Sequence, residues 1–207
     1  MTRPSKTVPV LCAVLLLILG GCAQPPTEQI NAAEQAIKEA QQSGAAIYLA
    51  DEYAKLEGSL ATIKKEVADQ DAKFALFRDY GKVDQLVATT KSEADRVKIE
   101  AVKKMEEAKA VATQAHHVAQ DEVKRALELV AKAPAGKDRA ALESIKTDAE
   151  ALKASLNDVQ MMIDKADYLA AQTKAKAIQE KSQALSREIE TALAKIGKGK
   201  PAAGKKK

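Results

Sequence analysis

Residues 82–133 read KVDQLVATTKSEADRVKIEAVKKMEEAKAVATQAHHVAQDEVKRALELVAKA, and one apolar stripe runs through the whole stretch. Its members follow one another in steps of three and four residues, which is the spacing of one helix face. The average step is close to that of a straight helix rather than a strict heptad. We therefore predict one helix, about 75 Å long at 1.5 Å per residue. The stripe consists of Val83, Val87, Thr90, Ala94, Val97, Ala101, Met105, Ala108, Ala112, Ala115, Ala119, Val123, Ala126 and Val130.

Alanine dominates this stripe. Seven of the fourteen positions are alanine, so a neighbouring helix can approach closely, although each contact buries little area. Tyr80-Gly81 is expected to turn the chain into the long helix, and Pro134-Ala135-Gly136 is expected to end it.

Two shorter helices are predicted before the long one. Pro25-Pro26 forms an extended spacer, because each proline restricts its own backbone and that of its predecessor. Thr27 is expected to cap the first helix, which ends at Ser43-Gly44. Asp51 is expected to cap the second helix. The apolar face of the first helix is Ile30, Ala33, Ala36, Ile37 and Ala40, and that of the second is Tyr53, Leu56, Leu60, Ile63, Val67, Phe74 and Phe77.

Two further helices are predicted after the long one. Asp138 is expected to start a fourth helix, and a bend near residues 165–167 leads to a fifth. Met161-Met162-Ile163 is interpreted as bundle core, with an adaptable partner-binding patch as the alternative. The fourth helix carries Leu142, Ile145, Ala149, Leu152, Leu156, Val159 and Ile163, and the fifth carries Ala171, Ile178, Leu185, Ile189, Leu193 and Ile196.

These patterns predict an all-α fold: an elongated antiparallel helical bundle or coiled coil built around the long helix at about 82–133. In the simplest packing, two helices lie along its front half and two along its rear half, which gives two three-helix bundles that share one helix. In the alternative, the long helix pairs with another chain as a coiled coil. The sequence is therefore also compatible with a homo-oligomer.

Composition argues against several functions. Ala, Lys, Glu, Gln and Leu dominate, and tryptophan is absent, a bias typical of long helices and poor in residues that line enzymatic pockets. The net charge of +4 includes two positive charges before residue 22 and five after Ile196, which leaves −3 for the body. Binding of a nucleic acid requires a basic surface on the folded part of the chain, so a nucleic-acid partner is not expected.

No catalytic, cofactor or metal site is predicted. His116 and His117 are consecutive, so on a helix they point about 100° apart and do not face one metal ion. A solvated or helix-packed pair is the expected state. Acidic residues alternate with lysines at helical spacing, as in Glu106 and Lys109, which indicates exposed ion pairs rather than a catalytic cleft.

The amino-terminal residues resemble a bacterial lipoprotein precursor. Arg3 and Lys6 precede an apolar run, residues 10–19, which is shorter than the about 20 residues of a transmembrane helix. Gly20 and Gly21 then precede Cys22. The resemblance implies cleavage between Gly21 and Cys22 and lipidation of Cys22. Two or more acyl chains hold a protein stably on a membrane. In enterobacterial lipoproteins, a residue other than aspartate after the cysteine, here Ala23, implies export to the outer membrane.

The carboxyl-terminal residues, 197–207, are rich in lysine, glycine and proline and are expected to be disordered. One interpretation is a solubilising tail. The other is that Lys205, Lys206 and Lys207 contact the anionic cell wall. A lipidated cysteine at one end and a terminal lysine at the other resemble the layout of murein lipoprotein, whose last lysine is joined covalently to peptidoglycan. Here Lys205-Lys206 stands in place of its Tyr-Arg pair.

A second resemblance covers residues 32–112, less than half of the chain. The stretch AEQAIKEA at 33–40, GAAIYLA at 44–50 and DYGKV at 79–83 are similar to alanine-rich helical lipoproteins of proteobacteria, classed under a domain of unknown function. Asp51 stands where that pattern has proline, and Arg78 where it has glycine. This family implies a location and a fold, and no activity.

The resulting hypothesis is a periplasm-facing outer-membrane lipoprotein, not an enzyme, that acts as a spacer or scaffold of the cell envelope. The alternative is an adaptor that docks a partner in an envelope transport or assembly complex. The expected segments are a signal peptide at 1–21, a spacer at 22–26, helices at 27–133, a helical hairpin at 134–196 and the tail at 197–207.

Overall fold

The computed structural model describes residues 23–133 and 139–198, and this part of the chain is helical without a strand. The helices are α2 (Thr27–Gln42), α3 (Ala45–Tyr48), α4 (Ala50–Asp71), the 3-10 helix η1 (Ala75–Phe77), α5 (Gly81–Lys132), α6 (Arg139–Asp164) and α7 (Tyr168–Lys198). The prediction of an all-α fold around one long helix is confirmed. The chain forms two compact units that divide inside α5, between Lys104 and Met105.

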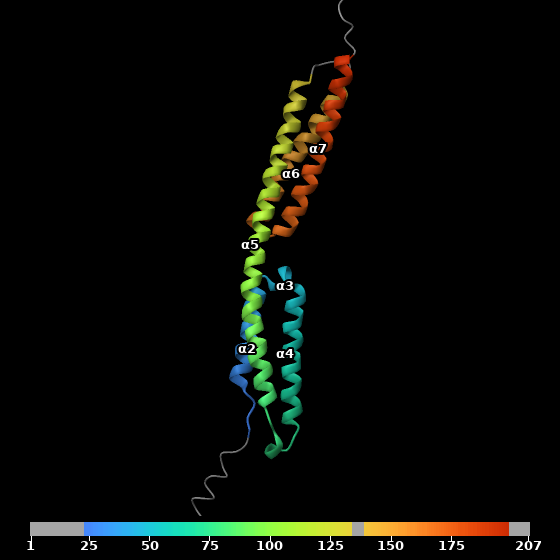
Figure 1. The fold of residues 1–207 in the computed structure, drawn as a ribbon. Coiled ribbons are helices and arrows are strands. Elements are labelled where there is room, and N and C mark those ends of the chain that lie inside the picture. Colours follow the sequence, from blue (N-terminus) through green and yellow to red (C-terminus); the bar gives the residue numbers. More distant parts are fainter. Residues whose placement is uncertain (1–22, 134–138, 199–207) are drawn as a thin grey trace, which may run out of the picture. The chain divides into compact units, whose positions relative to one another are not determined.

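In the first unit, α2 and α4 pack against the front half of α5 (Figure 1). One cluster joins Ala36 and Ile37 of α2 and Leu56 of α4 to Ala94 and Val97 of α5. Because Ala94 has no exposed surface, the alanine stripe brings the helices close together, as its composition predicts.

The first two helix starts differ from the predictions. Pro26, not Thr27, stands at the N-cap of α2, and the Thr27 hydroxyl donates to the carbonyl of Pro25 at 3.3 Å. Leu49, not Asp51, stands at the N-cap of α4. Asp51 lies in the first turn, where its carboxylate interacts favourably with the helix dipole. The short helix α3 was not predicted. It follows Gly44, whose φ of 89° is the left-handed conformation expected of a glycine helix end.

The second helix ends earlier than its apolar pattern indicates. α4 stops at Asp71, so Phe74 and Phe77 do not extend its buried face. Their side chains are 70% and 74% exposed. The prediction that they belong to the stripe is wrong, because an apolar residue beyond a helix end no longer follows the helical period.

In the second unit, α6 and α7 pack against the rear half of α5 (Figure 1). A cluster joins Ala126 of α5, Ile145 and Ala149 of α6, and Leu185 and Ile189 of α7. The predicted bend is present as a turn at residues 165 and 166 followed by Asp167. Its middle residue, Ala166, has a φ of 60°, and the amide of Asp167 donates to the carbonyl of Met162 at 2.9 Å.

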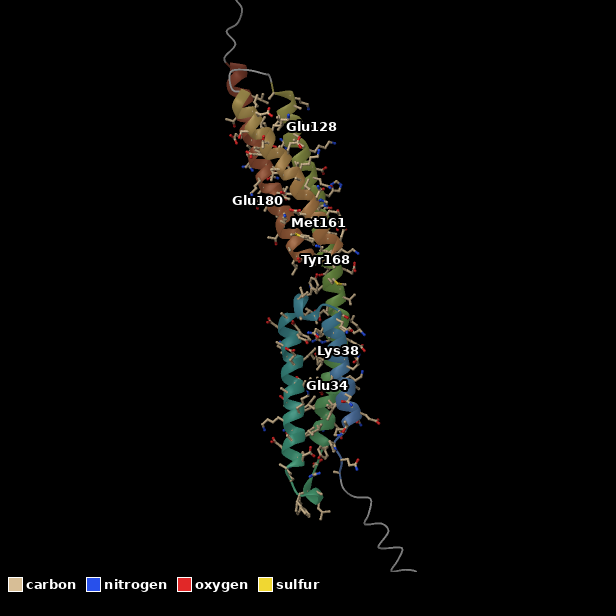
Figure 2. The ribbon with its side chains drawn as sticks, turned by 180° about the vertical axis from the view of Figure 1, so that it is seen from behind. Glu34, Lys38, Glu128, Met161, Tyr168 and Glu180 are labelled. Carbon is tan, nitrogen blue, oxygen red and sulfur yellow. The ribbon has the colours of Figure 1, made fainter. Side chains whose placement is uncertain are left out.

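Two details of this unit differ from the predictions. Met161 is 50% exposed beside the α6–α7 turn, near Tyr168, so its interpretation as core is wrong (Figure 2). Helix α7 continues to Lys198, two residues into the expected tail. The predicted helix end at 134–136, the cap Asp138 and the rest of the tail lie outside the described residues.

Candidate functional site

The loop between α4 and α5 presents three large apolar side chains to solvent. Phe74, Leu76 and Phe77 are 70%, 72% and 74% exposed, and we call them the apolar tip. The 3-10 turn between them is closed by a hydrogen bond from the amide of Phe77 to the carbonyl of Phe74 at 2.8 Å. The two phenyl rings lie 6.4 Å apart between centroids, at an interplanar angle of 51°. They therefore form one patch.

Arg78 fastens this loop to the end of α4. Its Nη2 donates to the carbonyl of Asp71 at 2.9 Å, and its Nε donates to the carbonyl of Lys73 at 3.1 Å. The last carbonyls of a helix lack partners inside the helix, and a basic side chain can satisfy them. Arg78 therefore both caps α4 and holds the residues that carry the apolar tip.

Gln70 and Tyr80 tie the two sides of the loop together. The Oε1 atom of Gln70 accepts from the amide of Asp79 at 3.1 Å and from Nζ of Lys73 at 2.9 Å. The hydroxyl of Tyr80 donates to Oδ1 of Asp71, and the tyrosine is only 4% exposed. The polar groups of the loop thus point into one network, while its large apolar groups point away from it.

A second set of contacts supports this network from the helix side. Glu66 of α4 accepts from Lys82 of α5 at 2.6 Å and from Nε2 of Gln70 at 3.0 Å. The hydrogen bonds from Lys82 and Gln70 hold the pKa of Glu66 below its usual value. Residues 69–82 contain three acidic and three basic side chains, so the loop and its flanks carry no net charge.

The apolar tip lies at the end of the first unit where α2 begins (Figure 1). Ile30, from the start of α2, packs in the same cluster as Val67 near the end of α4 and Val83 near the start of α5. The start of α2, Thr27, lies about 5 Å along the helix from Ile30, and the end of α4, Asp71, lies about 6 Å along the helix from Val67. The start of α2 and the end of α4 therefore lie at the same end of the unit.

The expected site residues at the two ends of the chain lie outside the described part. These are Gly21 and Cys22 at the cleavage position and Lys205, Lys206 and Lys207 in the tail. From Ala23, the chain leads through Pro25 and Pro26 into α2. Because Cys22 stands five residues before Thr27, at most about 18 Å of extended chain joins it to the start of that helix.

The histidine pair divides between core and surface. His116 is 7% exposed inside the second unit, whereas the side chain of His117 is 70% exposed and its Nδ1 lies 3.3 Å from Asp121. Burial lowers the pKa of His116, a hydrogen bond with the backbone of Leu156 raises it, and the charge of His117 lowers it. No metal-ligand cluster occurs within residues 23–133 and 139–198.

Other polar atoms accompany His116 in the core of the second unit. Ser182 and Ser186 of α7 are 0% and 3% exposed, and their hydroxyl groups have no hydrogen-bond partner among the described residues. Glu122 of α5 accepts from Nε2 of Gln183 at 3.1 Å through one oxygen, while its second oxygen is buried without a partner there. These groups come from separate helices, and the sequence patterns did not indicate them.

Surface ion pairs follow the predicted spacing in part. Glu106 and Lys109 lie 3.9 Å apart on α5, as expected. Lys98 instead joins α5 to α2, because its Nζ lies 2.8 Å from Glu39. Oε1 of Glu34 on α2 lies 2.8 Å from Nζ of Lys64 on α4. Ion pairs therefore connect the three helices of the first unit as well as successive turns of one helix.

Sequence reasoning missed the apolar tip because it assigned Phe74 and Phe77 to a buried face. One signal was available: Leu76 lies between them, and three large apolar residues within four positions do not share one helix face. Comparison of the chain with protein-family models, with curated proteins and with solved structures found no significant match. Within the described ranges, every helix is too short or too polar to be a membrane-span candidate.

Proposed function

We propose that this chain is a lipid-anchored lipoprotein of the bacterial cell envelope, held at the outer membrane by Cys22 and facing the periplasm as a spacer or scaffold. The observation that carries the proposal is the short connection between anchor and fold: α2 begins at Thr27, five residues after Cys22. A lipid on Cys22 therefore tethers one defined end of the first unit, close to the membrane surface.

The long helix suits a scaffold, because it takes part in both units. α5 has 52 residues, and the two units divide inside it. Both units pack against this helix, the first through Val83 and Val87 and the second through Ala126. An isolated helix has little stability in water, and most helix stability in proteins comes from packing. The contacts along both halves of α5 therefore stabilise it.

Labelled palmitate tests the anchor. Cells that express the wild-type chain should incorporate palmitate into it, and the Cys22→Ala variant should not. Separation of inner and outer membranes then tests the location, because Ala23 after the cysteine favours the outer membrane in the lipoproteins that this segment resembles. A wild-type protein that carries no label and fractionates with the periplasmic contents would contradict the proposal.

The lysine-rich end suits contact with the cell wall. Lys205, Lys206 and Lys207 supply three positive charges to an anionic polymer, with attraction that acts over about 8 Å at physiological salt. Covalent attachment through Lys207 is the stronger form of this hypothesis. Muramidase digestion of purified cell wall should then release a peptide of this chain that bears muropeptide mass. If no such peptide appears, covalent attachment is eliminated and non-covalent contact is the form left to test.

An adaptor is the second candidate, and a surface feature of α5 favours it. Ile99 and Val102 are 73% and 42% exposed, one helical turn apart. A photo-crosslinking residue at Ile99 distinguishes the two roles in intact cells. The control is the exposed position Ala88, about 16 Å earlier on α5. An adaptor should give one dominant foreign protein from Ile99 only, whereas a spacer should give mainly self-contacts and cell wall from both.

A further inference from the structure

We propose that the apolar tip, Phe74, Leu76 and Phe77, inserts into the lipid surface as a second, non-covalent attachment of the first unit. This inference deepens the proposed function and rests on the lipid anchor at Cys22. Its starting point is exposure: each of the three side chains leaves at least 70% of its surface in solvent. These three residues lie within four positions, and their two phenyl rings are 6.4 Å apart between centroids. An exposed apolar patch of this kind marks an interaction surface.

The loop is built to keep the tip exposed. Arg78 binds the carbonyls of Asp71 and Lys73, and Gln70 binds the amide of Asp79. These hydrogen bonds hold the loop on both sides of the tip in a conformation that leaves Phe74 and Phe77 exposed. They also satisfy backbone groups that would otherwise be costly to bring near a lipid surface.

The position of the tip identifies its occupant as lipid. Ile30 and Val67 pack in one cluster, so the start of α2 and the α4–α5 loop share one end of the unit. At most about 18 Å of extended chain joins Cys22 to the start of α2. An anchor in the membrane therefore brings this end of the unit to the bilayer. The exposed Ile47 lies at the other end of α4, and α4 is about 33 Å long.

The charge of the loop indicates how the tip binds. Residues 69–82 have equal numbers of acidic and basic side chains, so attraction to anionic headgroups contributes little. Apolar burial drives the insertion, which reaches the boundary between headgroups and acyl chains about 5–10 Å deep. Binding should therefore occur on zwitterionic lipid and change little with salt. The consequence is orientation, since two attachments at one end restrict the tilt of the first unit on the membrane.

A single tryptophan tests the proposal directly, because the chain contains none. Full-length lipoprotein carrying Phe77→Trp is purified from membranes and reconstituted into vesicles of phosphatidylcholine and phosphatidylethanolamine with brominated acyl chains. We expect a blue-shifted emission and strong quenching. Ile47→Trp is the matched control, because Ile47 is also exposed, at 65%, and it should show neither effect.

A second variant set tests whether the whole tip is needed. Leu76→Trp should be quenched like Phe77→Trp, and the quenching should be largely lost when Phe74→Ser and Phe77→Ser are added. The two serines replace exposed side chains, so helix content, measured by circular dichroism, should not change. Quenching that survives both serines would contradict insertion by the tip.

Vesicle flotation separates this proposal from the proposed function. Protein that floats with the vesicles while Phe77→Trp remains unquenched would overturn the tip and leave the anchor in place. If the chain with Phe77→Trp, as purified from membranes, carries no lipid at Cys22 and is still quenched, the tip is supported and the anchor is contradicted. A blue shift without bromine quenching, together with a dimer in sedimentation, would assign the tip to a second copy and overturn the proposal.

Discussion

The hydroxyl of Tyr80 donates a hydrogen bond to Oδ1 of Asp71, and this contact joins the start of α5 to the last residue of α4. The hydrogen bond raises the pKa of Tyr80, and burial raises it further. The phenol therefore stays protonated, and remains a donor, above the ordinary tyrosine range. This contact closes the base of the loop that carries the apolar tip.

Tyr80→Phe should lower the melting temperature, because it removes the hydroxyl and keeps the buried ring. The carboxylate of Asp71 would keep its approach from Arg78, with Nη1 3.9 Å from Oδ1, so the unit should still fold. Thermal unfolding followed by circular dichroism measures the change. Tyr53→Phe, which alters a partly buried tyrosine outside this loop, is the control. An unchanged melting temperature in Tyr80→Phe would show that the hydroxyl does not stabilise the loop.

Two glycines should respond to alanine in opposite directions. Gly58→Ala should stabilise the chain by about 1 kcal/mol, because it lies inside α4 with open space around its α-carbon. Gly44→Ala should destabilise it by about 1 to 2 kcal/mol, because φ is 89° and a β-carbon would lie 3.0 Å from the Tyr48 ring. Urea unfolding measures both. Equal effects of the two substitutions would contradict the assigned backbone conformation at Gly44.

The alanine stripe should resist enlargement. Ala94 has no exposed surface, between α2 and α4, so Ala94→Leu should cost about 1 to 3 kcal/mol through overpacking. Ala88→Leu alters an exposed position of the same helix and should change the free energy of unfolding by less than about 0.5 kcal/mol. Urea unfolding of both variants provides the comparison. If Ala94→Leu is as stable as Ala88→Leu, the helices do not approach closely at this point.

The second unit should lose stability as the pH falls below neutrality. Burial lowers the pKa of His116, while the histidine of an unfolded chain titrates near pH 6.5. The unfolded chain therefore takes up this proton more readily than the folded chain does. The contribution of the neutral His116 to the free energy of unfolding is complete above about pH 6.5 and is lost as the pH falls through the lower pKa of the folded state. Urea unfolding at pH 8 and pH 5 measures the change.

Substitutions separate this histidine from its exposed neighbour. His116→Leu should weaken the pH dependence between pH 8 and pH 5, because it removes the buried titrating group. His117→Gln should retain that dependence, since the side chain of His117 is 70% exposed. The same slope in the wild type and in His116→Leu would contradict a role for the buried imidazole.

The helices and most of their buried faces follow from local sequence. Spacing of three and four residues placed Val83, Val97 and Val123 on one face, and each is at most 2% exposed. Gly44 marked the end of α2, and Tyr80-Gly81 the start of α5. These features were predictable because helical periodicity and glycine conformations depend on neighbours close in the chain.

The apolar tip was decided by tertiary structure. Arg78 binds Asp71, and Asp79 binds Gln70, so α4 ends at a point that no glycine or proline marks. The phenylalanines beyond that end are exposed for this reason, although their spacing in the sequence after Val67 fits the apolar pattern of a helix. Burial of His116, which the stripe did not include, likewise depends on the helices packed around it in the second unit.

The sequence by itself determined the all-α class, the extent of the long helix and most of the faces that pack on it, since each depends on residue type and local spacing. Only the tertiary structure decided where α4 ends, which phenylalanines meet solvent and which histidine is buried. The physical reason is that the turn after α4 is held by side-chain contacts that span a loop, such as Arg78 with Asp71 and Lys82 with Glu66. A helical spacing of three and four residues does not encode such contacts.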